Sequence, residues 1–538
     1  MPAEDLPSTL PSMLARVVEA RAGFDAIATI AETIDYAELD RRSAQFARAL
    51  LALGAGKGAR IALLAPDGIF WTTAFLGGLR IGAVVTLVST LCAPPELAHI
   101  IRHSDIQILL AMRRFLRHDY GRHLAAAFPD LATQASQGPA LQLLDAPYLR
   151  SIWLDDPTGL GWASSTQKLL EKARAVDERL LEAVEAQVTP DEDAVIVYTS
   201  GSTAQPKAVV HTHWNLTRHP PELAKLFLIK PDDRMLPMLP AFWLGGLAMA
   251  MQVLSQGAAL VYPHSPDIEV VLQTLLQCRA NRVNGWGDGL TRLRNLAASK
   301  GVDVDAIIGL GRFRDTQGVL IPPLLQANLL GMSETFAPHS GEPINFRLPE
   351  DKQGASGRPV NHYERRVVDP DTGRQVPPGA IGELQLRGGG LMRGLYKKRR
   401  QEVFTADGFY PTRDLVRIDE DDYLTFVGRK GDMIKTRAAN VSRLEVEAAL
   451  NALPEVKLAV VTGLPDEAFG QTVAAAVVPQ AGQTPSAESL RQSLRDVLSS
   501  YKLPRRIVFV GEDDIPRTAT GKLKLHELAK LISSRDGQ

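Results

Sequence analysis

The centre of this sequence is the run Tyr198-Thr-Ser-Gly-Ser-Thr-Ala-Gln-Pro-Lys207-Ala-Val-Val-His-Thr-His213. Apolar residues 194–197 before it and 208–210 within it predict two buried strands. Between these strands lie small and hydroxyl-bearing residues, which let a backbone approach a ligand closely. Successive backbone N–H groups, hydroxyls and one lysine suit a polyphosphate. A surface hairpin rich in serine and threonine is the alternative, but the flanking strands and the terminal lysine favour a phosphate site.

The run differs from a Walker A loop, which requires the pattern G-x-x-x-x-G-K-[ST]. Here the lysine follows Pro206 and precedes Ala208. We therefore expect a phosphate-binding loop of another kind.

Composition narrows the class of protein. A chain of 538 residues predicts more than one domain. Lys and Arg number 60 and Asp and Glu 61, so the formal net charge of −1 gives no general attraction to nucleic acid or to an anionic membrane. Only two cysteines, Cys92 and Cys278, exclude a disulfide scaffold and favour a reducing compartment. Without a visible signal peptide or an apolar run of about 18 residues, we expect a cytoplasmic protein with no membrane span.

Helix and strand patterns alternate through the N-terminal part, which is typical of a largely parallel α/β sheet. The helical patterns there are 36–53, 71–79 and 96–103, and the strand patterns are 60–64, 82–88 and 106–110. The C-terminal part predicts a compact α+β unit. Its helical patterns are 444–453 and 487–499, and its strand patterns are 456–461, 473–478 and 507–510.

Several motifs together resemble the adenylate-forming (AMP-binding) superfamily, of the acyl-CoA synthetase or carboxylic acid–CoA ligase type. The resemblance covers about residues 36–528. Besides the central run, it rests on Gly58-Ala-Arg-Ile-Ala-Leu-Leu-Ala-Pro66, Pro237-Met-Leu-Pro-Ala-Phe-Trp-Leu-Gly-Gly246, Leu330-Gly-Met-Ser-Glu-Thr335, Asp407-Gly-Phe-Tyr-Pro-Thr-Arg-Asp414, Gly428-Arg-Lys-Gly-Asp-Met-Ile-Lys435 and Ile515-Pro-Arg-Thr-Ala-Thr-Gly-Lys522.

The resemblance implies an α/β fold with two domains. A large N-terminal adenylate-forming domain of mixed sheets and helices would span residues 1–430. A small, mobile α+β C-terminal domain would span 431–538, with the hinge at Gly431. Glycine reaches both signs of φ without steric cost, which suits a hinge.

The resemblance also implies roles for individual residues. Glu334 and Thr203 would hold Mg²⁺, and Asp414 and Arg429 would bind the ribose side of ATP. Lys522 would pair with the carboxylate and the α-phosphate during adenylation, so Lys522, Thr203 and Glu334 are the candidate catalytic residues. The remaining nucleotide contacts would come from Thr199, Ser200, Gly201, Ser202, Lys207 and Lys435.

The segment 237–246 resembles the part of the family that lines the acyl pocket, which makes Trp243 and Gly245 candidate pocket residues. A buried core aromatic is the alternative for Trp243. This chain departs from the family at several positions, among them Leu330 in place of an aromatic on adenine, and Arg413 and Ala438 in place of glycines. The stretch 309–318 is remodelled, and its glycines, Gly309 and Gly311, are candidates for a related turn.

The implied reaction has two steps. A carboxylate attacks the α-phosphate of ATP to give an acyl-adenylate and pyrophosphate, and coenzyme A then takes the acyl group as a thioester. Two alternatives stay open: an adenylating enzyme with a carrier-protein or other acceptor, and a non-catalytic nucleotide- or acyl-binding protein derived from this fold. The apolar stretch 240–247 favours an apolar acid, while the identity of the acid and the choice between monomer and homodimer stay open.

Overall fold

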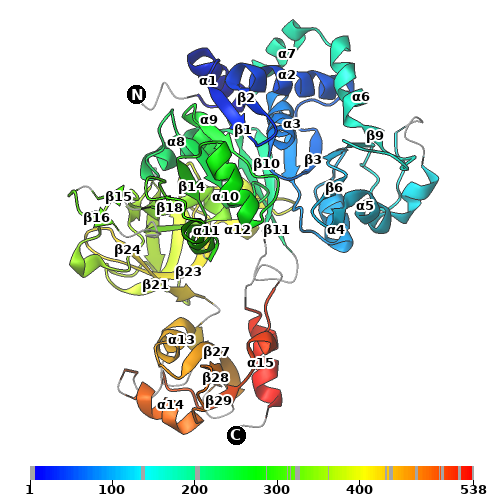
Figure 1. Cartoon of the computed structure of the whole chain (residues 1–538). Coiled ribbons are helices and arrows are strands. Elements are labelled where there is room, and N and C mark those ends of the chain that lie inside the picture. The colour runs from blue at the N-terminus through cyan, green and yellow to red at the C-terminus, as the bar shows by residue number, and fades with distance from the viewer. Residues whose placement is uncertain are drawn as a thin grey trace. The chain divides into compact units, whose positions relative to one another are not determined.

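The computed structural model describes residues 7–134, 140–199, 206–285, 288–311, 313–315, 317–321, 328–360, 363–430, 433–435, 440–466, 470–495, 497–498, 502–518 and 523–535. The chain forms two compact units, and Figure 1 labels their elements along the chain. The first comprises Met1–Glu364 and Arg387–Phe409, and the second comprises Arg365–Leu386 and Tyr410–Gln538. None of the helices in the described ranges is long and apolar enough to cross a bilayer.

The first unit contains two main sheets. The larger has the order β22-β11-β10-β4-β3-β5-β8-β9. Its strands are β3 (Arg60–Leu64), β4 (Val84–Leu87), β5 (Ile108–Ala111), β8 (Ser151–Leu154), β9 (Ser164–Ser165), β10 (Asp193–Thr199), β11 (Lys207–Thr212) and β22 (Gly394–Leu395). The smaller has the order β14-β12-β13-β1-β2. Its strands are β1 (Asp25–Ala28), β2 (Thr33–Asp35), β12 (Arg234–Pro237), β13 (Ala259–Val261) and β14 (Arg282–Asn284).

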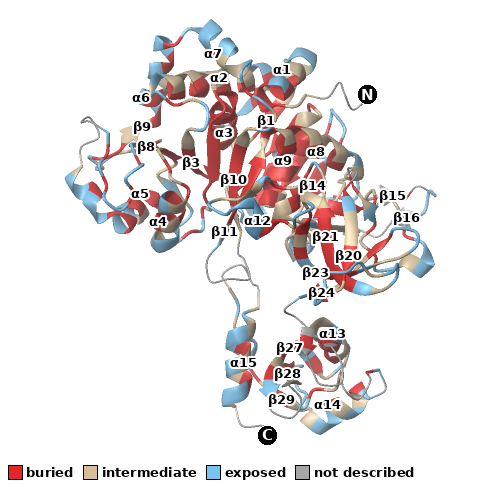
Figure 2. Ribbon diagram, turned by 180° about the vertical axis from the view of Figure 1, so that it is seen from behind, coloured by how far each residue is buried: buried red, intermediate tan, exposed pale blue. Residues whose placement is uncertain are grey.

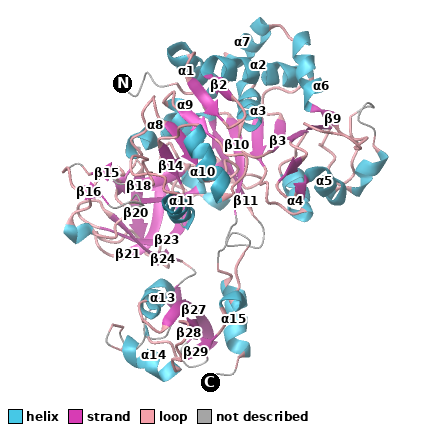
Figure 3. Cartoon of the chain, in the orientation of Figure 1, coloured by secondary structure: helices cyan, strands magenta, loops and turns pink. Residues whose placement is uncertain are grey.

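Most neighbouring strands of both sheets are parallel, as the alternating pattern predicted. The helices that accompany them in this unit are α1 (Leu10–Arg21), α2 (Tyr36–Ala52), α3 (Ile69–Arg80), α4 (Pro94–His103), α5 (Tyr120–Ala127), α6 (Thr166–Glu171), α7 (Glu178–Glu185), α8 (His213–Leu226), α9 (Leu244–Ser255), α10 (Ile268–Gln277), α11 (Asp288–Ser299) and α12 (Arg400–Val403). Figure 3 shows these helices around the two sheets.

Alternate residues of the strands face different layers, because successive side chains of a strand point to opposite faces. Ile61 and Leu63 of β3 join a core that also holds α1, α2, α3, α8 and α9 and reaches the smaller sheet. Ala62 and Leu64 join a second core with α4 and α5. The other face of the smaller sheet packs on α10 and α11. The unit is therefore layered helix, sheet, helix, sheet, helix, and its central strands are buried on both faces (Figure 2).

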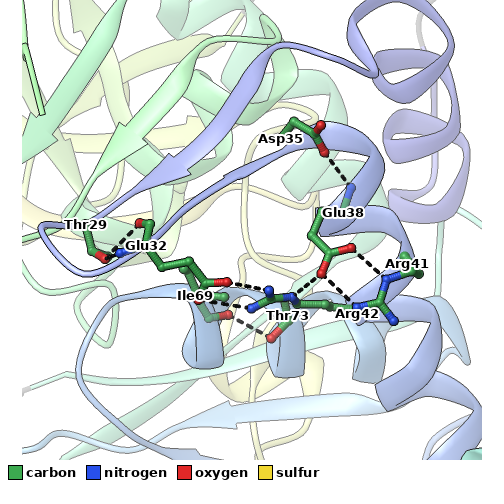
Figure 4. A network of polar contacts seen from close by, with 8 residues as sticks. All are labelled: Thr29, Glu32, Asp35, Glu38, Arg41, Arg42, Ile69 and Thr73. Carbon is green, nitrogen blue, oxygen red and sulfur yellow. Dashed lines mark hydrogen bonds and ion pairs between the residues drawn. The ribbon is translucent and has the colours of Figure 1, made fainter.

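A polar network fixes the start of α2 (Figure 4). The Asp35 carboxylate accepts the N–H of Glu38 at 2.8 Å, which caps the helix. Glu38 in turn accepts hydrogen bonds from Arg41 at 2.6 Å and Arg42 at 2.7 Å, and Arg42 also reaches Glu32 at 2.5 Å. These two guanidinium groups, Arg41 first, lower the pKa of Glu38 to about 2. The network thereby ties α2 to the turn between β1 and β2.

Short elements complete the first unit. They are β6 (Arg114–Phe115), β7 (His118–Asp119), β15 (Phe313–Arg314), β16 (Leu320–Ile321), β17 (Leu329–Met332), β18 (Ala337–Gly341) and β19 (Arg358–Pro359), with the 3₁₀ turns η2 (Pro129–Thr133), η3 (Lys172–Ala175), η4 (Ser333–Thr335) and η5 (Glu350–Lys352). β17, β18 and β19 form a small antiparallel sheet.

The second unit is α+β, as the sequence predicted for the C-terminal part. It contains an antiparallel sheet of order β20-β21-β23-β24 and a three-stranded sheet of order β27-β28-β29. The strands are β20 (Glu364–Val368), β21 (Ile381–Arg387), β23 (Tyr410–Ile418), β24 (Leu424–Arg429), β25 (Met433–Lys435), β26 (Asn440–Ser442), β27 (Val456–Asp466), β28 (Gly470–Pro479) and β29 (Arg506–Phe509).

Helices cover both faces of the three-stranded sheet. They are α13 (Arg443–Asn451), α14 (Ala487–Leu494) and α15 (Leu525–Ser534), with the 3₁₀ turn η7 (Glu512–Asp514). Ala459 and Val461 of β27 pack with α13 and α14, and the intervening Val460 packs with α15. The predicted hinge Gly431 lies outside the described residues, and a domain boundary at residue 430 stays a prediction.

Candidate active site

The central run folds as the sequence predicted, as one strand entering and another returning. β10 and β11 are antiparallel neighbours, and Thr199 at the end of β10 pairs with Lys207 at the start of β11. The two strands are anchored in the large sheet through β4 on one side and β22 on the other. Ser200, Gly201, Ser202 and Thr203 of the connecting loop lie outside the described residues. The sheet thus fixes both ends of the candidate phosphate loop.

Lys207 and Glu334 lie side by side in the first unit. The Lys207 Nζ is 3.9 Å from the Glu334 Oε1, and the two side chains are 28 % and 12 % exposed. That distance is an ion pair rather than a hydrogen bond. A cation and a carboxylate that face each other without a tight bond suit an anionic ligand with its counter-cation.

The turn that carries Glu334 is held by its backbone. The three consecutive carbonyl oxygens of η4 each accept a hydrogen bond from a different part of the unit. Ser333 O accepts from His211 Nε2 at 2.8 Å, Glu334 O from the N–H of residue 392 at 2.7 Å, and Thr335 O from the Tyr363 hydroxyl at 2.9 Å. Glu334 therefore has a fixed position beside Lys207.

Sequence reasoning missed the role of His211, although this residue lay within the central run. Lys207, Val209 and His211 point to the same face of β11, because side chains of a strand repeat every two residues. His211 is fully buried, and burial lowers its pKa to about 4. The imidazole is therefore neutral at pH 7, with its proton on Nε2, since the carbonyl of Ser333 only accepts. A polar ring on a buried strand position was the signal that was available.

Two glycines shape the backbone near this turn. A Cβ on Gly331 would overlap the carbonyl of Ala337, so β17 and β18 approach closely only with glycine there. Gly309 has φ +99°, and a Cβ there would overlap the carbonyl oxygen of Val283. The backbone at position 309 therefore requires a glycine, and its equivalence to the family's turn stays a prediction.

A cavity of about 540 Å³ adjoins these residues. It is bounded by α9, α11 and the strands β12, β14 and β17. Its apolar wall includes Met235, Leu244, Met249, Leu290 and Leu329. Its polar side chains are Gln252, Arg282, Asn284, Thr291 and Ser333. A larger hollow of about 940 Å³ beside β5, β8 and β9 contains none of the motif residues.

The candidate acyl-pocket residues differ in placement. Gly245 lines the cavity. Trp243 is the residue before α9, lies outside the described lining and is 37 % exposed, packing edge-to-face on Phe242 at 5.4 Å between ring centroids. A pocket role for Trp243 stays a prediction. Leu330 is half-buried in β17 and pairs with Ser340 of β18.

In the second unit, Asp414 and Arg429 form an ion pair across two strands. They are register partners on β23 and β24, and Arg429 Nε donates to Asp414 Oδ1 at 2.8 Å. The carboxylate is almost buried, at 3 % exposure, while the arginine side chain is 56 % exposed. The sequence predicted that both bind the ribose side of a nucleotide. The pairing itself shows how Arg429 orients the carboxylate.

Arg413 keeps the backbone conformation that its glycine-like position requires. Its φ is +65°, in the left-handed region that disfavours residues with a Cβ. Its N–H donates to Glu383 Oε1 at 3.2 Å. The departure from glycine at this position therefore leaves the turn before Asp414 intact.

Other predicted site residues lie outside the described part of the chain. These are the adenylation lysine Lys522 and the loop residue Ala438, and for Lys435 in β25 only the backbone is described. Their roles stay predictions.

Comparison with protein families decides the membership of this chain. Residues 14–396 match the AMP-binding enzyme family, and residues 445–522 match the AMP-binding enzyme C-terminal domain. The chain belongs to the AMP-binding enzyme family. The resemblance that the sequence motifs indicated is thus confirmed.

Full-length relatives of this AMP-binding enzyme are CoA ligases. It is 29 % identical to the 3-hydroxybenzoate–CoA/4-hydroxybenzoate–CoA ligase of Thauera aromatica, over 93 % of this chain and 92 % of that protein. It is 28 % identical to the indoleacetate–CoA ligase of Aromatoleum aromaticum, over 93 % and 94 %. Among solved structures, ATP-bound MatB from Rhodopseudomonas palustris is similar with a TM-score of 0.72, 25 % identity and coverage of 97 % and 98 %. This AMP-binding enzyme is an acid–thiol ligase of the AMP-forming type.

Proposed function

We propose that this ligase activates a largely apolar acid, of aromatic or medium-chain size, and transfers its acyl group to coenzyme A. The cavity beside Ser333 carries this proposal. Its volume of about 540 Å³ falls in the usual range for small-molecule sites, and its wall is mainly apolar. Ser333 lines the cavity and directly precedes Glu334, which pairs with Lys207. The relatives named for hydroxybenzoate and indoleacetate favour an aromatic acid.

In the first step, a carboxylate oxygen of the acid attacks the α-phosphorus of ATP. The bond from that phosphorus to the bridging oxygen of the β-phosphate breaks, and pyrophosphate leaves. Lys207 and the loop from Thr199 to Thr203 bind the phosphates, and Lys522 stabilises the charge at the α-phosphate. Asp414 accepts hydrogen bonds from the ribose hydroxyls, with Arg429 orienting it. Lys435 contributes a further contact to the nucleotide.

The residues present fit Mg²⁺ bound together with ATP. Among the described residues, no group of three or more His, Cys, Asp or Glu side chains is arranged to hold a metal alone. One carboxylate, Glu334, suits Mg²⁺, which usually takes one or two protein carboxylates and completes its shell with phosphates and water. Thr203 is the second proposed ligand. When bound, Mg²⁺ neutralises charge on the phosphates.

In the second step, the thiol sulfur of coenzyme A attacks the acyl carbon. The bond from that carbon to the phosphate oxygen breaks, AMP leaves, and the thiol proton passes to solvent. We assign the change between the steps to rotation of a small C-terminal domain, residues 431–538, about Gly431. A cytoplasmic location belongs to the proposal, and both cysteines, which are free and buried, are consistent with a reducing compartment.

The test uses purified protein, Mg·ATP, coenzyme A and a panel of aromatic and aliphatic acids. Mass spectrometry detects acyl-AMP and acyl-CoA, and Lys522→Ala and Lys207→Ala run alongside. We expect acyl-CoA from at least one acid and no acyl-AMP from Lys522→Ala. Acyl-AMP that never passes to coenzyme A would instead indicate a carrier protein or another acceptor. No adenylate from any acid, despite ATP binding, would refute the proposed activity.

A further inference from the structure

Gln252 is a polar side chain among apolar neighbours in the wall of the cavity. Gln252 on α9 is only 2 % exposed, and it lines the cavity among apolar neighbours. No described residue provides a hydrogen-bond donor to its Oε1. A buried amide oxygen without a partner destabilises a protein unless something satisfies it. A bound acyl group with a polar atom is the partner that the site itself suggests.

Gln252 lies at one end of the cavity. Leu244, Ala248 and Gln252 line it at intervals of four residues, so they form one face of α9. Eight residues separate Leu244 from Gln252, which is about 12 Å along a helix. Because α9 leaves the carboxyl end of β12 and leads to the amino end of the parallel strand β13, Gln252 lies at the amino ends of these strands.

The same end of the cavity contains Arg282, which is the first residue of β14 and pairs with Met235 of β12. β17 runs away from this end. Leu329, the first residue of β17, and Leu226 both lie close to Gly341. The next residue along the chain from Leu226 is Phe227, whose carbonyl accepts a hydrogen bond from Arg282. The start of β17 is thus near Arg282.

Ser333 follows the last residue of β17, so it lies about 10 Å or more from Leu329, at about 3.3 Å per strand residue. The reacting carboxylate belongs near Ser333 and Glu334. Gln252 therefore lies at the end of the cavity that is remote from Ser333 and Glu334.

The positive charge of Arg282, at the end of the cavity remote from Ser333, is already neutralised by Asp233. Arg282 is 2 % exposed, and its Nη1 donates to Asp233 Oδ2 at 3.1 Å and to the Leu228 carbonyl at 3.0 Å. Its Nη2 donates to the carbonyl of Phe227. A guanidinium paired in this way offers no free cation to a second carboxylate, and burying an unpaired carboxylate is strongly unfavourable. The remote end is thus polar but selects against an anion.

We propose that Gln252 is a specificity-determining residue that binds a neutral hydrogen-bond donor, above all a hydroxyl, on the distal part of the acid. This inference rests on the proposed function, because it assigns the cavity to the acyl group. Oε1 is itself buried in the cavity wall, so the amide turns to present it, and a hydroxyl then donates to Oε1 and accepts from Nε2. An acid that ends in a hydrocarbon leaves Oε1 buried without a partner, which sites of this kind penalise strongly.

The experiment compares matched pairs of acids that differ by one hydroxyl. The pairs are phenylacetate with 4-hydroxyphenylacetate, benzoate with 4-hydroxybenzoate, and octanoate with 8-hydroxyoctanoate. The kcat/KM for acyl-CoA formation is measured for the wild type, for Gln252→Met, which keeps the length but removes the amide, and for Met251→Leu. Met251 is buried on the same helix but does not line the described cavity, so its variant controls for repacking of α9.

We expect the wild type to prefer the hydroxylated member of its best pair by roughly tenfold or more. Gln252→Met should bring that ratio close to one, mainly by slowing the hydroxylated acid, and Met251→Leu should leave the ratio unchanged. Equal use of both acids by the wild type would overturn the inference, as would an equal loss on both acids in Gln252→Met. If Gln252→Met does not fold, the wild-type ratio decides. Absence of acyl-CoA from every acid would refute the proposed function instead.

Discussion

His211→Leu isolates the hydrogen bond that holds the turn of Glu334. In the wild type, His211 Nε2 donates to the carbonyl of Ser333 at 2.8 Å. Leucine fills most of the space but removes this donor, and the Ser333 carbonyl keeps the long hydrogen bond of 3.4 Å from the N–H of Phe336. Losing the shorter of the two hydrogen bonds in a buried place costs about 1–2 kcal/mol, which is the expected loss at pH 8. His211→Gln keeps an N–H donor in place of the imidazole and is the matched control.

The pH dependence of this loss has a definite sign. Burial lowers the folded-state pKa of His211 to about 4, whereas an unfolded histidine titrates near 6.5. Between these values only the unfolded chain takes up the proton, so the wild type loses stability as the pH falls from 6.5 to 4. At pH 5 this loss is about 2 kcal/mol. Leucine does not titrate, so the destabilisation by His211→Leu should shrink or reverse at pH 5.

Urea unfolding followed by tryptophan fluorescence is the assay. All six tryptophans lie in the first unit, which contains β11, so the signal reports on that unit. Pyrophosphate exchange with varied Mg²⁺ gives the functional reading, and we expect a lower kcat and a higher Mg²⁺ requirement in His211→Leu, with recovery in His211→Gln. The same difference in unfolding free energy at pH 8 and pH 5, or no difference at pH 8, would refute the reasoning.

Three further results are expected. Burial lowers the pKa values of His211, His213 and His219 to about 4, 4 and 3, and it raises the pKa of Asp67 to about 7. Below pH 6.5 the unfolded chain therefore binds two more protons at these four residues than the folded chain does. The free energy of unfolding should fall by about 3 kcal/mol per pH unit there, as tryptophan-monitored unfolding measures. Lys207→Met should lower pyrophosphate exchange about 100-fold, while urea unfolding shifts by less than about 1 kcal/mol, because its pair with Glu334 is long. Arg413→Val should destabilise the second unit by about 1–2 kcal/mol, because a β-branched residue fits φ +65° poorly, whereas Arg413→Gly should not, and circular dichroism during urea unfolding checks both.

The sequence predicted the elements whose signals are local. The strand 60–64 matches β3, and the helix 36–53 matches α2 within one residue. These elements show apolar residues at fixed intervals, and that spacing is a property of the segment alone. The helix predicted over 487–499 is shorter, because α14 ends at Leu494. Helix ends depend on neighbouring contacts that no short window contains.

The contacts of the site were harder to foresee, because they join distant segments. Glu334 was identified from its motif, but the turn that holds it takes hydrogen bonds from β11, residue 392 and Tyr363. Likewise, Asp414 and Arg429 were both assigned to the ribose, and only the register of β23 and β24 shows that they pair. Gln252 gave no signal in the sequence, since one glutamine in an apolar helix becomes unusual only when the cavity beside it is known.

Because η4 is held largely through its backbone, the position of Glu334 and the shape of the cavity beside it can change independently. The position of Glu334 depends on three carbonyl oxygens and on the Thr335 hydroxyl, which accepts the N–H of Met332 at 3.2 Å and donates to the Ala337 carbonyl at 2.7 Å, but on no described contact of the Ser333 side chain. Ser333, by contrast, lines the cavity that we assign to the acyl group. Substitutions at position 333 are therefore free to reshape the cavity while the nucleotide end stays in place. A family built on this turn can diversify its acids through single replacements and keep one activation chemistry.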